Sequence, residues 1–447
     1  MTSDTRLPPG PRSPGLWQMR QWFSDPVAFM ERNRERHGPV FSVKLGALKR
    51  CAFVADPDAA WQVLSGDPAT FRMGPTNALF RPVLGDHSLF LLDGEEHRHQ
   101  RRLLAPAFHR ASVRAYAGLI EEITARELAG WPVGRAFELQ PAMRRITTES
   151  IVRIVVGVCS PQRDDEIRRL VPEMLEIAEN PLALMPQFQR ELGGRSPFGR
   201  VMRVTREIEA LLFDEIALRR AAAGSERGGD VLSSLAAAEP HEEAFMTDRE
   251  IRDEIITLLI AGHETTANAL AWAFERLLRH PKALERLLAE PEDEDDYLDA
   301  VVRETLRQRP ILPITARRLT EPATVGEFTF PRGWTLMPCI YLIHKDPVAF
   351  PEPERFNPER YLTGPRPRSR VWVPFGAGSR HCIGNHLAML TIKTVLRTVL
   401  GRVRLSADPE PEPIVRNNMT LAPGRGATVT LVGPRGVPVP DHVPVAE

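Results

Sequence analysis

The residue with the clearest chemical potential is Cys382, which lies in the glycine-containing run Phe375–Gly384. Gly378 and Gly384 can adopt backbone angles that a side chain would forbid, so the main chain can approach a flat ligand closely. Backbone amides at the start of the helix expected to follow, together with Arg380, would stabilise a thiolate. The run is therefore suited to hold a sulfur ligand on iron. The alternative is an inert, buried thiol in a turn.

A second chemical centre is the pair Glu264 and Thr265, inside a long helix expected over residues 247–280. The capping box Thr247–Glu250 opens this helix and Pro281 stops it, which gives about 45 Å at 1.5 Å per residue. A threonine hydroxyl can bond to the carbonyl four residues back and open a notch in the helix. A carboxyl and a hydroxyl linked by water can then relay protons to bound oxygen.

Two other interpretations of this segment exist. His263 and Glu264 begin like the zinc motif HExxH, but Ala267 stands at the fifth position, where the second metal ligand would be. A purely structural polar defect is the other alternative, although burying such groups unsatisfied costs about 2 kcal/mol or more. The proton relay is the interpretation that the residue types favour.

Four motifs together resemble the cytochrome P450 family. The run around Cys382 matches its haem-binding loop, FxxGxRxCxG, at every fixed position. Before it in the chain come Ala261–Thr266, the ExxR motif Glu304–Arg307, and Pro358–Tyr361, which resembles the PERF element with Tyr for Phe. The similarity runs from about Pro8 to the C-terminal region, so it covers nearly the whole chain.

The resemblance implies a mainly α fold with small β-sheets. It implies a single domain over residues 1–447, with a Pro-rich arm at 1–15 and no fused reductase. A length of 447 residues would otherwise suggest two or three domains. Local patterns predict a helix at 26–37, paired strands at 40–45 and 51–55, a long loop at 74–93, a helix opened by 97–102, and a helix over 385–400. Residues 180–200 resemble a mobile lid, and the acidic run 290–299 is expected to be a solvated loop.

The resemblance also implies haem b as the cofactor, with Cys382 as its axial thiolate ligand. Haem contacts are implied for residues of the cysteine loop, for the central helix and for cations that would face the propionates: Phe375, Gly378, Arg380, Gly384, Ala261, His97, Arg101 and Arg317. His97 and Arg101 are four residues apart and share a helix face, for which a solvated basic face is the plainer alternative. Arg318 competes with Arg317 for the propionate.

An ionic network is expected behind the haem. Glu304 and Arg307 are neighbours on a helix because they are three residues apart. The resemblance implies that they join Arg360, while Arg355, in a similar sequence, is the competing candidate. Truncating one partner of such a buried network would cost about 3 to 5 kcal/mol.

The candidate substrate pocket is apolar. It would draw on the long loop, the central helix, the segment after the ExxR helix and a C-terminal turn: Phe80, Leu84, Leu89, Ala261, Ile311, Leu312, Ile314 and Met419. With no charged anchor among them, affinity would come mainly from buried apolar area at about 25 cal/mol per Å². A terpenoid, fatty acyl or polyketide-type substrate is therefore expected.

The expected activity is insertion of one atom of O2 into such a molecule, by hydroxylation or epoxidation. Electrons from NAD(P)H would arrive through a separate ferredoxin and ferredoxin reductase, and the basic run Arg366–Arg370 is a candidate contact for the acidic ferredoxin. One rival is a peroxygenase or isomerase of the same fold, whose members often lack the acid and alcohol pair. Another is a non-enzymatic haem sensor, which would need no proton relay.

Composition limits the partners and the compartment. The formal net charge of zero argues against bulk attraction to nucleic acid or to an anionic membrane. Cys51, Cys159 and Cys339 form no disulfide or zinc pattern and are expected to be buried thiols. The first ten residues lack the apolar core of a signal peptide or membrane span. The expectation is a soluble, cytoplasmic monomer without a membrane anchor.

Overall fold

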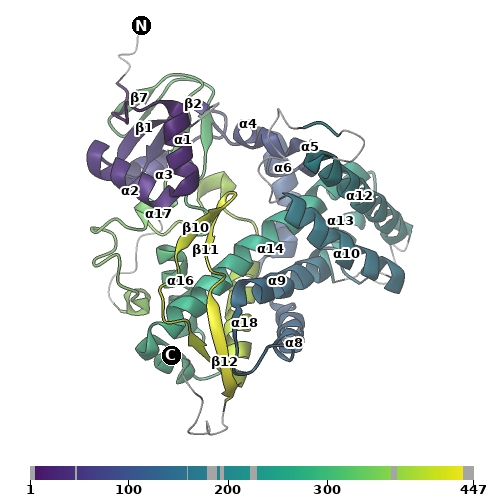
Figure 1. Ribbon diagram of the computed structural model, residues 1–447. Helices are drawn as coiled ribbons and strands as arrows, with labels where there is room; N and C mark the ends of the chain where they lie inside the picture. The colour runs from purple at the N-terminus through teal and green to yellow at the C-terminus, as the bar shows by residue number, and fades with distance from the viewer. Residues whose placement is uncertain are drawn as a thin grey trace.

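The computed structural model describes residues 6–45, 48–158, 160–178, 189–191, 196–221, 229–363 and 370–435. These residues are mostly helical, with small sheets beside and in front of the helices (Figure 1). The predicted fold class is therefore confirmed. The lid segment at 180–200 lies mostly outside the described residues, as do Cys159 and residues 366–369 of the basic run.

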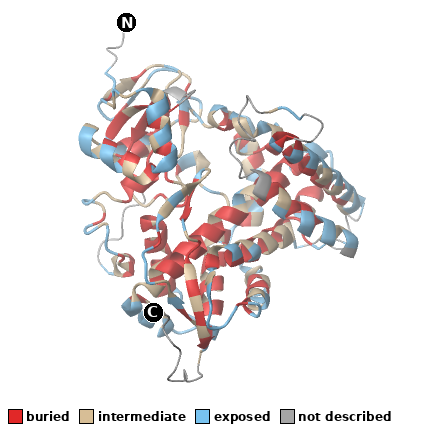
Figure 2. Ribbon diagram, viewed as in Figure 1, coloured by how far each residue is buried: buried red, intermediate tan, exposed pale blue. Residues whose placement is uncertain are grey.

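The central element is helix α14 (Asp248–Leu278), which begins at the predicted capping box. Thr247 Oγ1 accepts the Glu250 amide at 3.3 Å, and Glu250 Oε2 accepts the Thr247 amide at 2.7 Å. These bonds satisfy amides that a helix N-terminus leaves without partners. Figure 2 shows α14 buried along most of its length. It packs against α9 (Leu139–Val155), α16 (Asp296–Gln308) and α18 (Asn385–Arg402).

Other helices surround this core. They are α1 (Gly15–Ser24), α2 (Pro26–His37), α3 (Pro57–Ser65), α4 (Gly74–Asn77), η1 (Ala78–Phe80), α5 (Arg81–Leu84), α6 (Gly94–Leu104), η2 (Ala105–Phe108), α7 (Arg110–Arg114), α8 (Ala117–Leu128), α10 (Pro161–Ala178), α12 (Pro197–Ala221), α13 (Val231–Ala236), α15 (Pro281–Leu288), α17 (Ile340–Ile343), η5 (Pro358–Tyr361) and η6 (Gly378–Arg380).

The largest sheet has the strand order β1-β2-β8-β5-β3. Strands β1 (Val40–Leu45) and β2 (Leu48–Val54) form the predicted antiparallel hairpin, and β8 (Thr335–Pro338) pairs with β2 in parallel. The remaining strands are β3 (Phe71–Arg72), β4 (Ala136–Glu138), β5 (Arg317–Leu319), β6 (Ala323–Val325), β7 (Phe328–Phe330), β9 (Val403–Ala407), β10 (Ile414–Asn417), β11 (Thr420–Pro423) and β12 (Thr428–Pro434). Helix α3 packs its apolar face on the largest sheet, against β8 and β2.

One sequence prediction about loops is wrong, and a second holds only in part. Residues 74–93 contain the short helices α4, η1 and α5 instead of one continuous loop. Pro75 and Pro82 favour these turns because a proline in the first helical turn gives up no helical hydrogen bond. In the acidic run, the Glu290 carboxylate accepts the amides of Tyr297 and Leu298 at 2.5 and 3.1 Å. Glu290 thus caps helix α16, whereas residues 291–295 form the exposed loop that the sequence predicts.

Candidate active site

The loop that carries Cys382 is bent by two glycines with positive φ. Gly376 has a φ of 69° and Gly378 a φ of 65°, a region that strains any residue with a side chain. Gly378 also passes so close to α3 that a Cβ would lie 2.5 Å from the carbonyl oxygen of Leu64. The Cys382 amide then donates to the Phe375 carbonyl at 2.9 Å, which closes the loop just before α18.

Gly384 does not need an unusual backbone angle, so that part of the sequence prediction is wrong. Its φ is −85°, and it is the N-cap residue of α18. A Cβ at this position would meet no protein atom within 4 Å. Glycine at this position therefore leaves space beside the loop and relieves no strain.

Cys382 differs from the other described cysteines in its exposure. Cys51 and Cys339 are buried, and burial raises the pKa of each thiol to about 12. Cys382 keeps accessible surface, although desolvation by the surrounding loop raises its pKa. A hydrogen bond from the Gly384 amide and the charge of Arg101 lower that pKa. These two groups favour the thiolate.

Arg380 binds other groups than the Cys382 thiol, so the expectation that its charge stabilises the thiolate is corrected. Its guanidinium is in an ion pair with Asp93 at 2.5 Å and donates to the Leu89 carbonyl at 3.0 Å. The side chain is almost fully buried by these contacts. Arg380 therefore ties the cysteine loop to the segment before α6, and Arg101 is the cation that acts on the thiol.

His97 and Arg101 of α6, Arg317 of β5 and Arg380 form a group of basic residues in which Arg101 is half-buried and the other side chains are buried. Burial, followed by the charges of Arg380, Arg101 and Arg317, lowers the pKa of His97 to about 3, so its imidazole is neutral at neutral pH. Burial lowers the pKa of Arg317 to about 10, and the charge of Arg380 adds to this shift. Arg318, the competing candidate, is exposed.

The positive charge of this group is not balanced within the described residues. Arg101 and Arg317 have no ion pair there, and the side chain of Arg317 donates to neutral oxygens of its neighbours. Asp93, the acid that acts on Arg317, is already paired with Arg380. Buried cations are costly without a counter-charge. The group therefore fits a ligand that carries carboxylates.

Near its middle, helix α14 leaves accessible surface at Ala261 and Thr265, a stretch that we call the notch. Thr265 Oγ1 donates to the Ala261 carbonyl at 2.7 Å, the back-bond that the sequence predicts. Ala261 is exposed and Thr265 is half-buried, although both lie on a helix that is otherwise buried. A Cβ on Gly262 would lie 2.7 Å from Ile151 Cδ1, so glycine allows α9 to pack closely against this part of α14.

Glu264 has partners that sequence reasoning missed. Its Oε1 accepts hydrogen bonds from Asn417 Nδ2 at 2.8 Å and from Thr420 Oγ1 at 3.0 Å. Asn268 Nδ2 lies at 3.5 Å and the Arg144 guanidinium at 3.7 Å from the same oxygen. The predicted position of neighbouring Met419 near the pocket could have suggested the hairpin residues. No sequence signal indicates Arg144.

The expected ionic contacts behind the cysteine loop are present. Arg307 and Glu304 are fully buried and paired at 2.8 Å, and Arg360 reaches the same carboxylate at 3.1 Å. Arg355, the competing candidate, pairs instead with exposed Glu352. Arg307 also donates to the carbonyls of two loop residues, so the network fastens the segment before η5 to α16.

The apolar residues predicted for the pocket differ in exposure. Leu84 and Ile311 are buried in the core and leave little surface for a ligand. Met419 is 42% exposed. Ala261 is exposed. The remaining four residues are half-buried: Phe80, Leu89, Leu312 and Ile314.

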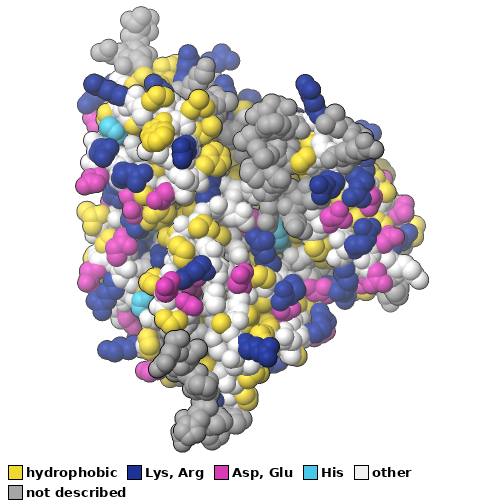
Figure 3. Space-filling model, viewed as in Figure 1, with side chains coloured by type: hydrophobic (Ala, Val, Ile, Leu, Met, Phe, Trp, Pro, Cys, Tyr) yellow, Lys and Arg dark blue, Asp and Glu magenta, His cyan; other side chains and the backbone are white. Residues whose placement is uncertain are grey.

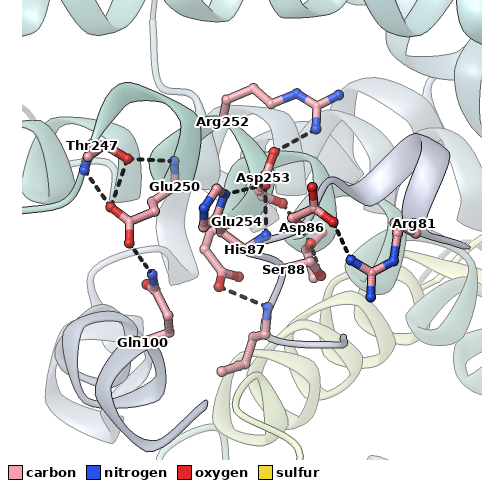
Figure 4. A network of polar contacts seen from close by, with 12 residues as sticks. Arg81, Asp86, His87, Ser88, Gln100, Thr247, Glu250, Arg252, Asp253 and Glu254 are labelled. Carbon is pink, nitrogen blue, oxygen red and sulfur yellow. Dashed lines mark hydrogen bonds and ion pairs between the residues drawn. The ribbon is translucent and has the colours of Figure 1, made fainter. Parts of the chain in front are cut away.

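The segment before α6 is fastened to the N-terminal half of α14 (Figure 4). Asp253 Oδ2 accepts the His87 amide at 2.9 Å, and Glu254 Oε1 accepts the Leu89 amide at 2.9 Å. Thr257 Oγ1 donates to Ser88 Oγ at 2.7 Å. Burial raises the pKa of Glu254 well above its usual range. Sequence reasoning identified neither Asp253 nor Glu254, because both lie in a charged stretch that matches no motif.

Comparison with known proteins decides the family. The sequence model of the family described as Cytochrome P450 matches residues 8–430. The chain belongs to the cytochrome P450 family. Two relatives from Mycobacterium tuberculosis, named "Putative cytochrome P450 135B1" and "Putative cytochrome P450 138", are each 38% identical to it. The first alignment covers 98% of this chain and 93% of the relative, and the second covers 90% of each.

Solved P450 structures share the fold. The retinoic-acid-bound cyanobacterial CYP120A1 superposes with a TM-score of 0.81 at 25% identity, over 96% of this chain and all of that chain. The haem domain of cytochrome P450DA superposes with a TM-score of 0.79 at 22% identity, over 96% and 97% of the two chains. The single-domain P450 fold and the P450 monooxygenase class are thus established.

Membership in the family implies a haem held by a cysteine thiolate, together with a need for O2 and electrons. The residues present fit that group, because they include an exposed thiol, free space beside Gly384, and the cations Arg101 and Arg317 without an ion pair among the described residues. In the part of the chain that the structure describes, no helix is long and apolar enough to cross a bilayer. On the face shown in Figure 3, basic and acidic side chains are interspersed, in keeping with the net charge of zero.

Proposed function

We propose that this P450 uses Cys382 as the haem ligand and inserts one oxygen atom into an apolar small molecule. The observation that carries the proposal is the exposed Cys382 thiol near half-buried Arg101 and buried Arg317, two cations without a carboxylate partner among the described residues. Arg101 links the thiol to the cation group, because its charge lowers the pKa of Cys382 and also acts on His97 of that group. The haem supplies the activation of O2 by two electrons.

The cation group indicates haem b, whose propionates would balance its charge. The proposed propionate contacts are His97, Arg101 and Arg317, with neutral His97 as a hydrogen-bond donor. The other proposed haem contacts come from the cysteine loop and the notch of α14: Phe375, Gly378, Arg380, Gly384 and Ala261. Arg380 acts there mainly through Asp93 and Leu89, which it binds directly.

Proton delivery is assigned to Glu264 and Thr265. The Thr265 hydroxyl donates to the Ala261 carbonyl, so its lone pairs can accept hydrogen bonds from water in the notch. The Glu264 carboxyl passes a proton to such a water and regains it from solvent. This pair favours monooxygenation over the peroxygenase, isomerase and sensor alternatives.

The proposed substrate is a terpenoid, fatty acyl or polyketide-type molecule. The half-buried apolar side chains of the predicted pocket support this class. Similar CYP120A1 was solved with retinoic acid, an apolar isoprenoid acid. Electrons are proposed to come from a separate ferredoxin and its reductase. A cytoplasmic location fits buried Cys339, which forms no disulfide with another described residue, and we propose that the protein acts as a monomer.

The ligand assignment is tested with the reduced protein under carbon monoxide. The wild type should show the red-shifted Soret band of a thiolate-ligated haem, and Cys382→Ser should lose it. Cys339→Ala is the control, because that buried thiol lies in the sheet core, and it should keep the band. A thiolate band in Cys382→Ser would overturn the assignment. Spin-state titration with a terpene, a fatty acid and a macrolide then ranks the substrate classes.

A further inference from the structure

The hairpin β10–β11 reaches from the core to the catalytic helix. Asn417 pairs with Thr420 at its end, and Asn418 between them has a φ of 49°. Beyond the tip the hairpin is anchored, because the Leu421 amide donates to the Ile311 carbonyl at 2.8 Å and the indole of buried Trp272 donates to the Leu421 carbonyl at 3.3 Å. The tip is therefore held in a defined position over α14.

Asn417 donates to Glu264 Oε1, and the single hydroxyl proton of Thr420 is directed either to that same atom or to the Asn417 carbonyl at 2.9 Å. Asn417 Nδ2 is 2.8 Å and Thr420 Oγ1 is 3.0 Å from Oε1, and the Glu264 side chain is only 12% exposed. Hydrogen bonds to a carboxylate are about twice as strong as those between neutral groups. With Oε1 fixed by Asn417, and by Thr420 when its proton points there, the rotation of the carboxyl group about its bond to Cγ is fixed as well.

Met419, which is expected from the sequence to contribute to the pocket, lies between these two residues. Met419 is 42% exposed, whereas Thr420 next to it is buried. A molecule that contacts Met419 touches the same two-residue tip from whose ends Asn417 and Thr420 project. The position of the hairpin tip and the orientation of the acid are thereby mechanically linked.

We propose that Asn417 and Thr420 are positioning residues for Glu264, and that they couple substrate contact at the hairpin tip to proton delivery. The inference rests on the proposed function of Glu264 as the proton donor. Asn417 holds Oε1, and so does Thr420 when its proton points there, so the proton leaves the carboxyl group along a fixed direction to a water in the notch, and the carboxylate regains a proton from solvent.

The test uses the haem-loaded enzyme with a surrogate ferredoxin and reductase, without substrate and with dodecanoic acid as the probe. Asn417→Ala and Thr420→Val should slow the proton-dependent step about tenfold, less than the roughly hundredfold or greater loss expected on removal of a general acid. More NADPH should then be consumed to form hydrogen peroxide, with a larger solvent isotope effect. Thr420→Ser restores the hydroxyl and should restore the wild-type ratio.

Thr428→Val is the matched control, since the Thr428 hydroxyl binds the Arg425 carbonyl and not the acid. It should leave the peroxide share and the isotope effect unchanged. A second readout does not depend on turnover: backbone hydrogen exchange of residues 414–423 should accelerate in Glu264→Ala, because the hairpin tip loses its acceptor. The same peptide should be unaffected in Thr265→Ala.

The outcomes separate this inference from the function on which it rests. If Glu264→Gln increases peroxide formation but Asn417→Ala and Thr420→Val do not, the coupling through the hairpin is refuted and the proton donor stands. Unchanged exchange of residues 414–423 in Glu264→Ala also refutes it. If Glu264→Gln leaves the peroxide share unchanged, Glu264 is not the proton donor and both proposals fail.

Discussion

At the scale of single residues, Gly378 and Gly384 of the cysteine loop are glycines for different reasons. Gly378 has a positive φ and lies against the Leu64 carbonyl, so an added methyl group must displace backbone. Gly384 has an ordinary φ, and its missing Cβ borders free space. Gly378 is therefore required by the fold of the chain itself, whereas Gly384 keeps the space beside the loop open.

We therefore expect Gly378→Ala to lower the stability of the haem-free protein, because of backbone strain of about 1 to 3 kcal/mol and the clash with α3. Gly384→Ala should leave that stability unchanged but speed the loss of haem to an acceptor apomyoglobin. Thermal unfolding of both haem-free variants, followed by haem-transfer rates, checks the contrast. Equal destabilisation by the two substitutions would contradict it.

Thr265 gives a second prediction at this scale. Thr265→Ala removes a hydroxyl from the notch and substitutes a better helix former, so haem content and substrate affinity should persist. NADPH consumption should continue, but more of it should end as hydrogen peroxide. The ratio of product to NADPH, with peroxide quantified, measures this. The double variant with Thr266→Ala excludes a substitute hydroxyl, and unchanged coupling in it would mean that protons arrive by another route.

The candidate haem ligand Cys382 and the candidate proton donor Glu264 could be identified from the sequence, because each lies in a motif of fixed spacing. The partners of Glu264 could not, because Asn417 is 153 residues away from it in the chain. A contact of that kind depends on how the hairpin packs on α14, and the residue types Asn and Thr carry no signal of it. Arg380 was misjudged for the same reason, since distant Asp93 binds its charge.

At the scale of elements, the Glu304, Arg307 and Arg360 network joins α16 to η5. Arg360→Ala would remove a charged hydrogen-bond donor from the fully buried Glu304 carboxylate, which stays paired with Arg307, so we expect a loss of about 1.5 to 3 kcal/mol of stability. Arg355→Ala removes an exposed ion pair in the same segment and should cost about 1 kcal/mol or less. Denaturant unfolding of the two variants compares their free energies of unfolding directly. Similar losses would show that the network contributes little to stability.

Elements whose ends have local signals were predictable, and those shaped by distant contacts were not. Helix α14 is an example of the first kind, because Thr247 and Glu250 cap it and Pro281 follows it. The short helices between residues 74 and 84 are of the second kind. Their path depends on the fastening of residues 87–89 to α14, which no local pattern reveals.

At the scale of the whole molecule, buried His344 links stability to pH. Its Nε2 accepts the Val373 amide at 3.0 Å, and burial, followed by the charge of Arg307, lowers its pKa from 6.5 to about 3. Between pH 6.5 and about pH 3, His344 binds a proton in the unfolded chain but stays neutral in the folded protein. Stability should therefore be fully present above pH 6.5 and fall below it, by up to about 1.4 kcal/mol per pH unit for this histidine.

The measurement is the free energy of unfolding between pH 7.5 and pH 4.5, by urea titration. His344→Gln keeps an acceptor but cannot titrate, so its stability should depend less steeply on pH. His241→Gln, at an exposed position, should retain the slope of the wild type. Identical slopes in His344→Gln and the wild type would mean that other groups dominate the acid response.

The parallel pairing of β2 with β8 has a consequence for the order of events during synthesis. Cys51 lies opposite Thr335, so about 280 residues separate the partners in the chain. At about 5 to 20 residues per second, the ribosome needs roughly 15 to 55 seconds to deliver the second strand after the first. Throughout that interval the hairpin of β1 and β2 has an open edge that nothing in the native pairing can yet cover. The sheet that begins the chain is therefore among the last parts of the protein to be completed.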